Sequence, residues 1–255
     1  MKKEQNSSQY ILQSVDNALR VLNLFEHENS LTLTEIAQKL GCGKTIAFRL
    51  LYTLENQGYL QKQNGQYTLG LRLFYLGSKV QYKNTLVSLM EPVLKELTAA
   101  VNETVHLVVW ENDNQVLMID EFLPNQSLMA VNKNFSKRPP HMTSTGMAML
   151  STRSDREIIE YAQNVMFEKK TQNSIESLTQ LMTDIIAIRE CGYAVNDQLY
   201  ETGVCSIAVP IIKTPGAPAQ LAVSVSGPAA RMEENRRTII DALFETAEKI
   251  KDLPI

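Results

Sequence analysis

The first 60 residues repeat apolar side chains at the spacing of amphipathic helices, in three successive segments. The first segment covers residues 14–28, begins at a possible Ser14 cap and predicts a helix with one apolar face. That face consists of Val15, Leu19, Leu22 and Phe25. The second segment is short, can be capped by Thr32 or Thr34, and stops at Gly41. Its predicted buried positions are Ile36, Ala37 and Leu40.

The third segment runs from Lys44 to Asn56, and Gly58 ends it; its apolar positions are Ile46, Ala47, Leu50, Leu51 and Leu54. Two short helices joined by a tight turn with glycine are typical of a helix-turn-helix, in which the second helix offers its N-terminal half to a DNA major groove. Two strand-like runs follow, at 59–62 and 66–69, and Asn64-Gly65 between them is a hairpin signal. The pattern therefore predicts a winged helix-turn-helix over residues 1–70.

The periodicity changes along the rest of the chain. Residues 71–85 have a helical pattern with few breakers, so we expect a linker helix there. Residues 86–255 begin with another helix and continue with strand-like runs between helices. The strand candidates flank a turn at 112–114 and lie at 192–197, 206–213 and 219–227, before a final helix from about Met232 to Lys251. Strands mixed with flanking helices predict an α+β sheet domain over residues 86–255.

Charge is distributed unevenly between the two predicted domains. The 255 residues carry a net charge of −3, with 44% hydrophobic and 21% charged residues, which is an ordinary globular composition. Residues 1–75 hold eight Lys or Arg and six Asp or Glu, a balance of +2, which leaves −5 for the remainder. A basic head on an acidic body is typical of a DNA-binding domain attached to a ligand-binding one, although ordinary surface variation also accounts for it.

Several classes of protein are disfavoured by the sequence. No run approaches the ~18 apolar residues of a membrane helix, and the first ten residues lack the apolar centre of a signal peptide, so we expect a cytoplasmic protein with no membrane contact. The three cysteines (Cys42, Cys191, Cys205) show no CxxC spacing, and the histidines (His27, His106, His141) lie far apart. We therefore predict no metal site and no cofactor.

No catalytic motif is present either, since no G-x-S-x-G or HExxH pattern occurs. We therefore predict no catalytic residues and no enzyme. Two alternatives stay open: an enzyme acting on a small acid through residues 86–255, and a winged helix that binds protein instead of DNA.

The tripeptide Gly43-Lys44-Thr45 raises the question of a phosphate-binding loop. That motif needs another glycine five residues before Gly43 and a strand leading into it. Position 38 is Gln38, and the preceding segment is helical, so the sequence argues against the motif. Lys44 and Thr45 instead begin the third helix, where side chains and free amides can bind DNA phosphates.

Further candidates for DNA contact follow on the same helix. Arg49 can read a base, clamp a phosphate or pair with Glu55 inside the domain. Ile46 and Phe48 can each touch a thymine methyl group or belong to the core. The predicted DNA-binding residues are Lys44, Thr45, Ile46, Phe48 and Arg49.

Four sequence motifs occur along the chain in the order and spacing that a known protein family shows. They are SVDNALRVLNLFE through GQYTLGLRLFYLG (14–77), HMTSTGMAMLS (141–151), RECGYAVNDQLYETGVCSIAVPI (189–211) and LAVSVSGPAARM (221–232). Together they resemble the IclR family of bacterial transcription regulators over essentially the whole chain. The resemblance implies a winged helix-turn-helix, a linker helix and a GAF-like, profilin-related effector-binding domain. It also implies a homodimer, further associated as a dimer of dimers, that binds a pseudo-palindromic double-stranded DNA operator and responds to a small organic acid.

The same resemblance implies where the acid binds. Backbone amides near Ser144, Thr145 and Gly146 would hold its carboxylate at a helix start. The other implied contacts are Asn196 or Asp197, Ser206, Ser224 and Ser226 as hydrogen-bonding side chains, with Leu128 and Met129 as an apolar wall. Ser224 and Ser226 are two apart on a strand, so they share one face. Each hydroxyl can instead be satisfied by the backbone.

Two residues close in sequence to these candidates, His141 and Cys205, also need a role. His141 can contact the ligand or pin its loop, and Cys205, next to Ser206, should point to the opposite face of the strand. The chain departs from the family pattern at Ile46, where a hydroxyl is common, at Ser144 and Thr145, where smaller residues occur, and at Met147, where lysine is frequent. We expect a ligand-responsive transcription regulator of a catabolic operon, with repression favoured over activation.

Overall fold

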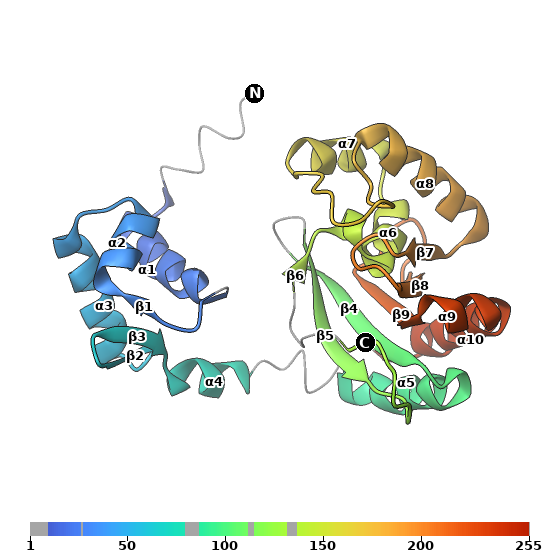
Figure 1. Cartoon of the computed structure of the whole chain (residues 1–255), viewed down its shortest axis with the longest axis horizontal. Helices are drawn as coiled ribbons and strands as arrows, with labels where there is room; N and C mark the ends of the chain where they lie inside the picture. The colour runs from blue at the N-terminus through green and yellow to red at the C-terminus, as the bar shows by residue number, and fades with distance from the viewer. Residues whose placement is uncertain (1–9, 27, 80–86, 112–114, 132–136, 255) are drawn as a thin grey trace. The chain divides into compact units, whose positions relative to one another are not determined.

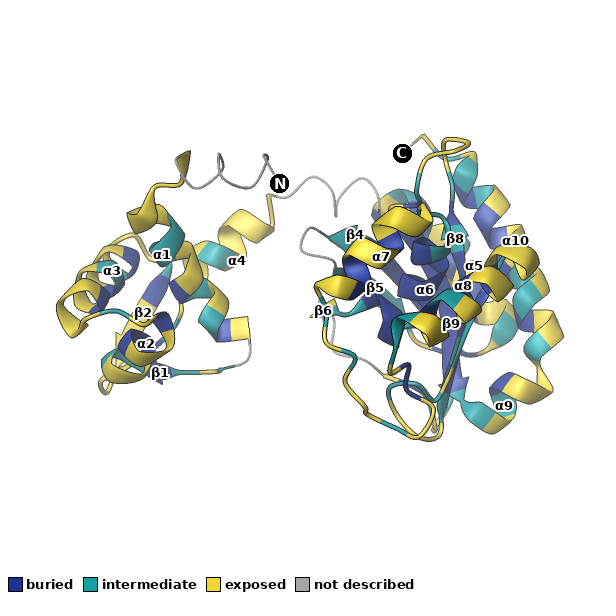
Figure 2. Cartoon of the chain, turned by 90° about the horizontal axis from the view of Figure 1, so that it is seen from above, coloured by how far each residue is buried: buried dark blue, intermediate teal, exposed yellow. Residues whose placement is uncertain are grey.

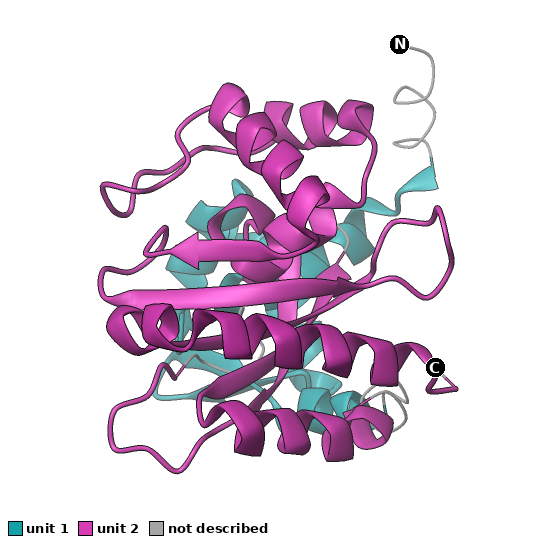
Figure 3. Ribbon diagram, turned by 90° about the vertical axis from the view of Figure 1, so that its right-hand side faces the viewer, with its two compact units in different colours: residues 1–81 teal, residues 82–255 magenta. Residues whose placement is uncertain are grey.

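The computed structural model describes residues 10–26, 28–79, 87–111, 115–131 and 137–254. The chain divides into two compact units, residues 1–81 and residues 82–255 (Figure 3). Helix α4 (Leu71–Gly77) covers the first part of the expected linker helix, and residues 80–85 of that expected helix lie outside the described residues. The finer boundaries at residues 70 and 85 stay a prediction.

The helices of the N-terminal unit that precede its β-hairpin are labelled in Figure 1. They are α1 (Gln13–Asn23), α2 (Leu33–Leu40) and α3 (Lys44–Asn56), and a 3₁₀ turn η3 (Leu24–Glu26) follows α1. Thr32 caps α2 through a capping box, in which its own amide donates to the Glu35 carboxylate at 2.7 Å. Gly41 ends α2 with a φ of 67°, a conformation that glycine adopts readily.

A small antiparallel sheet completes this unit. Strands β2 (Leu60–Gln63) and β3 (Gln66–Leu69) form the predicted hairpin, and Asn64 and Gly65 between them have φ values of 51° and 81°, as a type I′ turn requires. A third strand, β1 (Leu31–Thr32), pairs with β3 on its other side. The sequence did not predict β1, because two residues are too short to show an alternating pattern.

The apolar face predicted for the first helix is wrong in part. The structure buries Val21 and Phe25, whereas Val15 and Leu19 are 51% and 56% exposed. The cap also differs, because α1 begins after Leu12 with no side-chain cap. Exposed apolar residues on α1 therefore face away from the core of their own unit.

The C-terminal unit is built on one six-stranded antiparallel sheet. Its strands are β4 (Thr104–Glu111), β5 (Gln115–Phe122), β6 (Lys137–Arg138), β7 (Ala194–Asp197), β8 (Val204–Ile211) and β9 (Leu221–Pro228). They lie in the order β6-β5-β4-β9-β8-β7. The predicted strands at 192–197, 206–213 and 219–227 correspond to β7, β8 and β9.

Helices cover both faces of this sheet, which confirms the predicted α+β class. Helices α5 (Ser88–Val101), α9 (Ala229–Glu234) and α10 (Arg236–Lys251) pack on one face, and α6 (Ser144–Ser151), α7 (Asp155–Gln163) and α8 (Leu178–Cys191) lie on the other. Figure 2 shows α6 as a buried segment, and residues 144–150 are all buried. None of the helices in the described residues is long and apolar enough to cross a membrane.

The end of the chain differs from its prediction. One helix was expected from about Met232 to Lys251, but the chain breaks at Asn235 into α9 and α10. Both halves are helical in pattern, so the apolar spacing does not show the break. Met232 and Ile239 both stay in the core that the two helices share with the sheet.

Candidate functional site

The third helix of the N-terminal unit has a buried side and an exposed side. Ala47, Leu51 and Leu54 are buried in the core of the unit, as the helical spacing predicted. Lys44 and Thr45 are exposed at the start of the helix, after the N-cap Gly43. With α2 and the Gly41-Cys42-Gly43 turn before it, α3 is the second helix of a helix-turn-helix.

The structure narrows the alternatives left open for three residues of α3. Ile46 is 51% exposed and Phe48 is 49% exposed, so neither belongs to the core. Arg49 is exposed, and within the described part of the chain its side chain has no hydrogen-bond or ion-pair partner, Glu55 included. All three side chains are therefore open to an external partner.

A cavity of about 90 Å³ lies in the C-terminal unit, between the sheet and the start of α6. Four apolar side chains line part of it: Val108, Val116, Met118 and Val204. The other lining residues are polar or charged: His106, Arg138, Thr143, Ser144, Thr145, Asn196, Tyr200, Glu201, Ser206, Ser224 and Ser226. This lining is more polar than that of most small-molecule sites, which suits a small ligand with several polar groups.

Polar residues form a line across five neighbouring strands, which we call the polar row, and all of its members except Glu121 line this cavity. Cross-strand register places the members next to one another: Asn196 opposite Ser206, Ser206 opposite Ser226, Ser224 opposite His106, and His106 opposite Glu121. Ser224 and Ser226 are each only 3% exposed. A buried polar row in a sheet that is otherwise apolar costs desolvation free energy, which suits a binding site better than a core.

His106 lies in the middle of the polar row. Its Nε2 is 3.0 Å from a Glu121 carboxylate oxygen, and both side chains are almost fully buried. Its Nδ1 is 3.5 Å from the Ser224 hydroxyl and 3.4 Å from the Ser226 hydroxyl. Both of these distances are long for hydrogen bonds, so the serine hydroxyls can turn toward a ligand at little cost.

The start of α6 faces the polar row. Thr143 caps this helix, because its hydroxyl accepts a hydrogen bond from the Gly146 amide at 3.0 Å. The Ser144 hydroxyl is 2.8 Å from the Ser206 hydroxyl, which ties the helix start to β8. The first amides of a helix have no acceptor within the helix and carry the positive end of its dipole, so this end favours an anion.

Arg138 and the loop after β7 contribute further lining residues. The Arg138 guanidinium lies 4.1 Å from the centre of the Tyr200 ring, a cation–π contact between β6 and the β7–β8 loop. Asn196 holds the base of this loop, because its amide nitrogen donates to the Met142 carbonyl at 3.0 Å and its oxygen accepts from the Leu199 amide at 2.7 Å. Asn196 thus positions the loop and the entry to α6 together.

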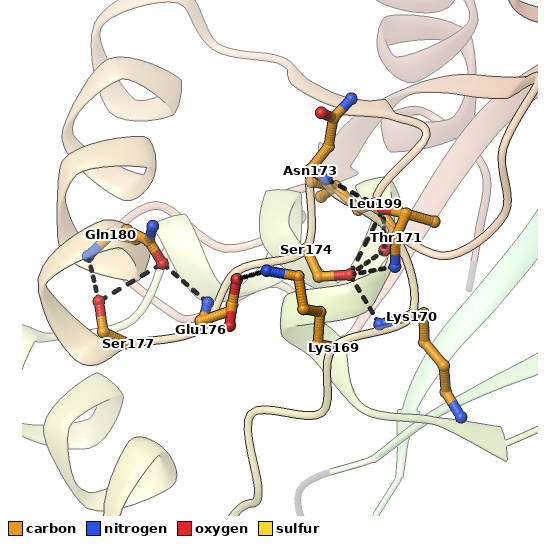
Figure 4. Close-up of polar contacts among 9 residues, drawn as sticks. All are labelled: Lys169, Lys170, Thr171, Asn173, Ser174, Glu176, Ser177, Gln180 and Leu199. Carbon is orange, nitrogen blue, oxygen red and sulfur yellow. Dashed lines mark hydrogen bonds and ion pairs between the residues drawn. The ribbon is translucent and has the colours of Figure 1, made fainter.

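A second segment also fixes this loop, as Figure 4 shows. The Ser174 hydroxyl donates to the Leu199 carbonyl at 2.9 Å and accepts from the Lys170 and Thr171 amides. The Thr171 hydroxyl donates to the Gln198 carbonyl at 2.7 Å. These contacts hold the residues just before Tyr200 in place.

The cavity brings together six of the predicted effector-binding residues and leaves out four. Ser144, Thr145, Asn196, Ser206, Ser224 and Ser226 line it, and their contact with an effector stays a prediction. The residues outside its lining are Leu128, Met129, Gly146 and Asp197. Leu128 is 65% exposed, and its carbonyl accepts from Arg231. Gly146 acts through packing, because a Cβ there would lie 2.3 Å from the Pro140 Cα.

Sequence reasoning missed five polar lining residues: His106, Arg138, Thr143, Tyr200 and Glu201. For His106 a signal existed, since it alternates with Val108 on one face of a predicted strand. That alternation does not show which strand lies alongside, so the approach of Ser224 was not predictable. The other four lie in short or irregular segments without a periodic pattern.

His141 and Cys205 have structural surroundings. His141 is buried beside α7, with its Nδ1 2.6 Å from the Tyr161 hydroxyl and its ring against Phe167. It does not line the cavity, so it pins the segment before α6. Cys205 lies in the core on the opposite face of the sheet from Ser206, as strand alternation predicted.

Comparison with known families decides the identity of the whole chain. Residues 14–64 match the model described as "IclR helix-turn-helix domain", and residues 79–252 match "Bacterial transcriptional regulator IclR C-terminal". The chain belongs to the IclR family. The resemblance stated from the sequence is therefore confirmed, and the protein is a DNA-binding transcriptional regulator with an effector-binding C-terminal domain.

Individual IclR proteins are similar to this chain over most of their length. The Acetate operon repressor of Salmonella typhimurium is 28% identical over 242 residues, which cover 93% of this chain and 88% of the relative. The crystal structure of an IclR regulator from Alicyclobacillus acidocaldarius has a TM-score of 0.82 and 26% identity, covering 95% and 98% of the two chains. An IclR homologue from Microbacterium hydrocarbonoxydans, complexed with 4-hydroxybenzoate, has a TM-score of 0.76 and 21% identity, covering 93% and 97%.

Family membership also bears on whether Glu121, His106 and the two serines form a catalytic triad. Their carboxylate–imidazole–hydroxyl order resembles that of a hydrolase triad. The hydroxyls, however, lie 3.4 and 3.5 Å from the imidazole, beyond the usual reach of about 2.6–3.2 Å for a nucleophile and its base. The family models and relatives describe transcriptional regulators, which agrees with the absence of a close nucleophile–base contact at His106.

Proposed function

We propose that this regulator binds a small organic acid in the cavity between α6 and the polar row, and that binding changes the affinity of α3 for a pseudo-palindromic operator. The supporting observation is the cavity itself, in which the start of α6 faces buried serine hydroxyls. Amides at a helix start favour a carboxylate, and hydroxyls suit a second polar group on the same molecule. Control of a catabolic operon, by repression, completes the proposal.

The size of the cavity favours a compact acid. A cavity of roughly 150 Å³ holds a benzene ring. The cavity here has about 90 Å³, so an acid with a short chain fits without rearrangement, whereas an aromatic acid does not. Arg138 adds a positive charge to the lining and Glu201 a negative one, so an acid that also carries hydroxyl or oxo groups would match the lining.

On the DNA side, the proposal assigns the exposed residues of α3. Lys44 and Thr45 at the helix start contact phosphates, where the amides and the helix dipole assist them. Arg49 reaches a base edge, because its side chain is exposed and unpaired within the described residues. Ile46 and Phe48 add apolar contacts to the same groove.

Exposed apolar residues on α1 and α4 support a homodimer through the N-terminal units. Leu12, just before α1, is 71% exposed, and Val15 and Leu19 on α1 are 51% and 56% exposed; on α4, Leu71 and Phe74 are 80% and 78% exposed. Large exposed apolar residues grouped on helices mark a protein interface more often than free surface. A second copy of the chain fits them best, since two helix-turn-helix units are needed to read a pseudo-palindrome.

A mobility-shift titration tests the function. The full-length protein is titrated on the DNA upstream of its own gene, against random competitor DNA and with a panel of short-chain and aromatic carboxylic acids. We expect one short-chain acid to change operator affinity by roughly 5–150-fold, the usual range of allosteric coupling. If no acid in the panel changes the affinity of a specific complex, the acid-responsive part of the proposal is wrong.

A pair of serine variants connects that response to the cavity. Ser226→Ala removes a lining hydroxyl, and we expect the half-maximal acid concentration to rise about 2–10-fold, as for the loss of one hydrogen bond. Ser151→Ala is the matched control, because its hydroxyl bonds to the Ala148 carbonyl outside the cavity. Equal effects of the two substitutions would place the acid elsewhere.

A further inference from the structure

Helix α3 carries an exposed pair of aromatic side chains, which we call the aromatic pair. The phosphate contacts of Lys44 and Thr45 and the base contact of Arg49 do not account for it. Phe48 and Tyr52 are one turn apart, and their rings stack with centroids 6.2 Å apart and planes inclined by 27°. Phe48 is 49% exposed and Tyr52 is 62% exposed. A stacked pair limits the rotamers of both rings, so Phe48 is held in one orientation before any partner arrives.

The aromatic pair does not belong to the core of the N-terminal unit. Ala47, Leu51 and Leu54 form the inner side of α3, and the exposed rings of Phe48 and Tyr52 lie on its flank, roughly 90–130° around the helix from that side. Thr45 lies three residues before Phe48 and Arg49 three residues before Tyr52, so both are neighbours of the rings on the helix surface. The rings therefore stand among the very side chains that face outward from the helix-turn-helix.

The neighbouring charges indicate what covers the aromatic pair. Lys44 and Arg49 are exposed beside it, and the first turn of α3 has no acidic residue. Cations at the N-terminal end of the pair, with Glu55 at its other end, match a helix whose N-terminal half enters the DNA major groove, where phosphates lie on both sides and thymine presents an apolar methyl group on the floor. Thymine is the only one of the four bases with this methyl group, so an apolar contact there carries sequence information.

We propose that Phe48 contacts the methyl group of one thymine in each operator half-site, and that Tyr52 is the positioning residue that fixes the Phe48 ring by stacking. Tyr52 is not among the DNA-binding residues predicted from the sequence, and the proposal gives it an indirect role in the choice of DNA sequence. The inference rests on the proposed operator binding by α3 and names one base that α3 recognises.

Replacement of thymine by deoxyuridine tests the contact, because deoxyuridine keeps the base pair and lacks only the methyl group. Binding sites are first selected from a random DNA pool with the full-length protein, and each thymine of the selected site is then replaced in turn. We expect one position per half-site at which the replacement weakens binding about fourfold. That factor corresponds to one buried methyl group of about 0.8 kcal/mol.

Variants connect the thymine preference to the aromatic pair. Phe48→Ala should bind the thymine and deoxyuridine sites equally, and Tyr52→Ala should reduce the preference. Tyr52→Phe should retain it, because the ring stays and only the hydroxyl is lost. Lys44→Ala is the control, since loss of a phosphate contact should weaken binding to both sites by the same factor.

Three results would overturn the inference, and they separate it from the operator-binding role. A thymine preference that Phe48→Ala leaves unchanged assigns the methyl contact to another residue. A specific site at which no deoxyuridine replacement matters overturns the methyl contact while α3 remains the reading helix. Failure to enrich any sequence overturns the operator-binding role as well. Circular dichroism of each variant shows whether a loss of binding reflects a loss of fold.

Discussion

At the scale of single residues, His141 is the group whose protonation should matter most for the C-terminal unit. Burial lowers the pKa of His141 from 6.5 to about 4. As the pH falls below 6.5, the unfolded chain takes up a proton that the folded chain refuses until about pH 4. The stabilising contribution of neutral His141 is therefore complete above pH 6.5 and is lost as the pH falls toward 4. Over that window we expect a loss of about 3 kcal/mol.

Urea denaturation of the wild type and of His141→Gln at a series of pH values between 7 and 4 measures this loss. Other groups also titrate in this window, but they are the same in both proteins, so the difference in slope isolates His141. The variant should lose less stability on acidification than the wild type by about 3 kcal/mol. Parallel curves for the two proteins would show that His141 is protonated equally in the folded and unfolded states.

At the scale of elements, Gly146 sets how closely α6 can approach the turn before it. A Cβ at this position would lie 2.3 Å from the Pro140 Cα and 2.4 Å from its carbonyl oxygen, and the neighbour is backbone that cannot turn aside. Gly146→Ala should therefore push the start of α6 away from Pro140. We expect about 1–3 kcal/mol of lost unfolding free energy, as for an overpacked core, together with weaker acid binding.

Gly77→Ala is the matched control for this substitution. Gly77 lies in α4, and nothing lies within 4 Å of a Cβ built there. Alanine at that position should leave the unfolding free energy unchanged or raise it slightly, because alanine is the better helix former. Thermal unfolding of both variants gives the comparison. If Gly146→Ala is as stable as Gly77→Ala, the close approach of α6 is not required.

Elements with strong local signals were predictable from the sequence. The bounds of α3 and the Asn64-Gly65 hairpin follow from helical spacing, flanking glycines and turn chemistry, all of which act within a few residues. The apolar face of α1 was not predictable in the same way. Val15 and Val21 are equally apolar, and only tertiary packing decides that Val21 is buried and Val15 exposed.

For the candidate site, the sequence predicted only on which face of its strand each side chain lies. Two-residue alternation places Ser224 and Ser226 on one face and Cys205 on the other, and the structure agrees. The pairing of β4 with β9, however, joins residues more than 100 positions apart, and no local signal encodes it. For that reason His106, paired with Ser224 across β4 and β9, emerges only from the fold.

At the scale of the whole molecule, the exposed apolar residues of α1 and α4 predict that the regulator reads DNA as a dimer. Phe74 on α4 is 78% exposed, so Phe74→Glu should leave the fold intact and place a charge where a second copy would pack. Sedimentation velocity at micromolar concentration should show a dimer or larger assembly for the wild type and a smaller species for the variant. The control is Met166→Glu in the C-terminal unit, since Met166 is 86% exposed and its substitution should leave the assembly unchanged.

The same variant separates avidity from recognition on DNA. A dimer binds the second half-site as an intramolecular event, which typically raises affinity by about 10²–10⁴-fold without any new contact. Phe74→Glu should therefore lose on the order of a hundredfold in affinity for a full pseudo-palindrome, while its affinity for a single half-site stays close to that of the wild type. Equal losses on both DNAs would mean that Phe74 supports the fold of the N-terminal unit. An unchanged assembly with unchanged operator affinity would mean that the two copies meet through other surfaces, and that the exposed apolar residues of α4 serve a different partner.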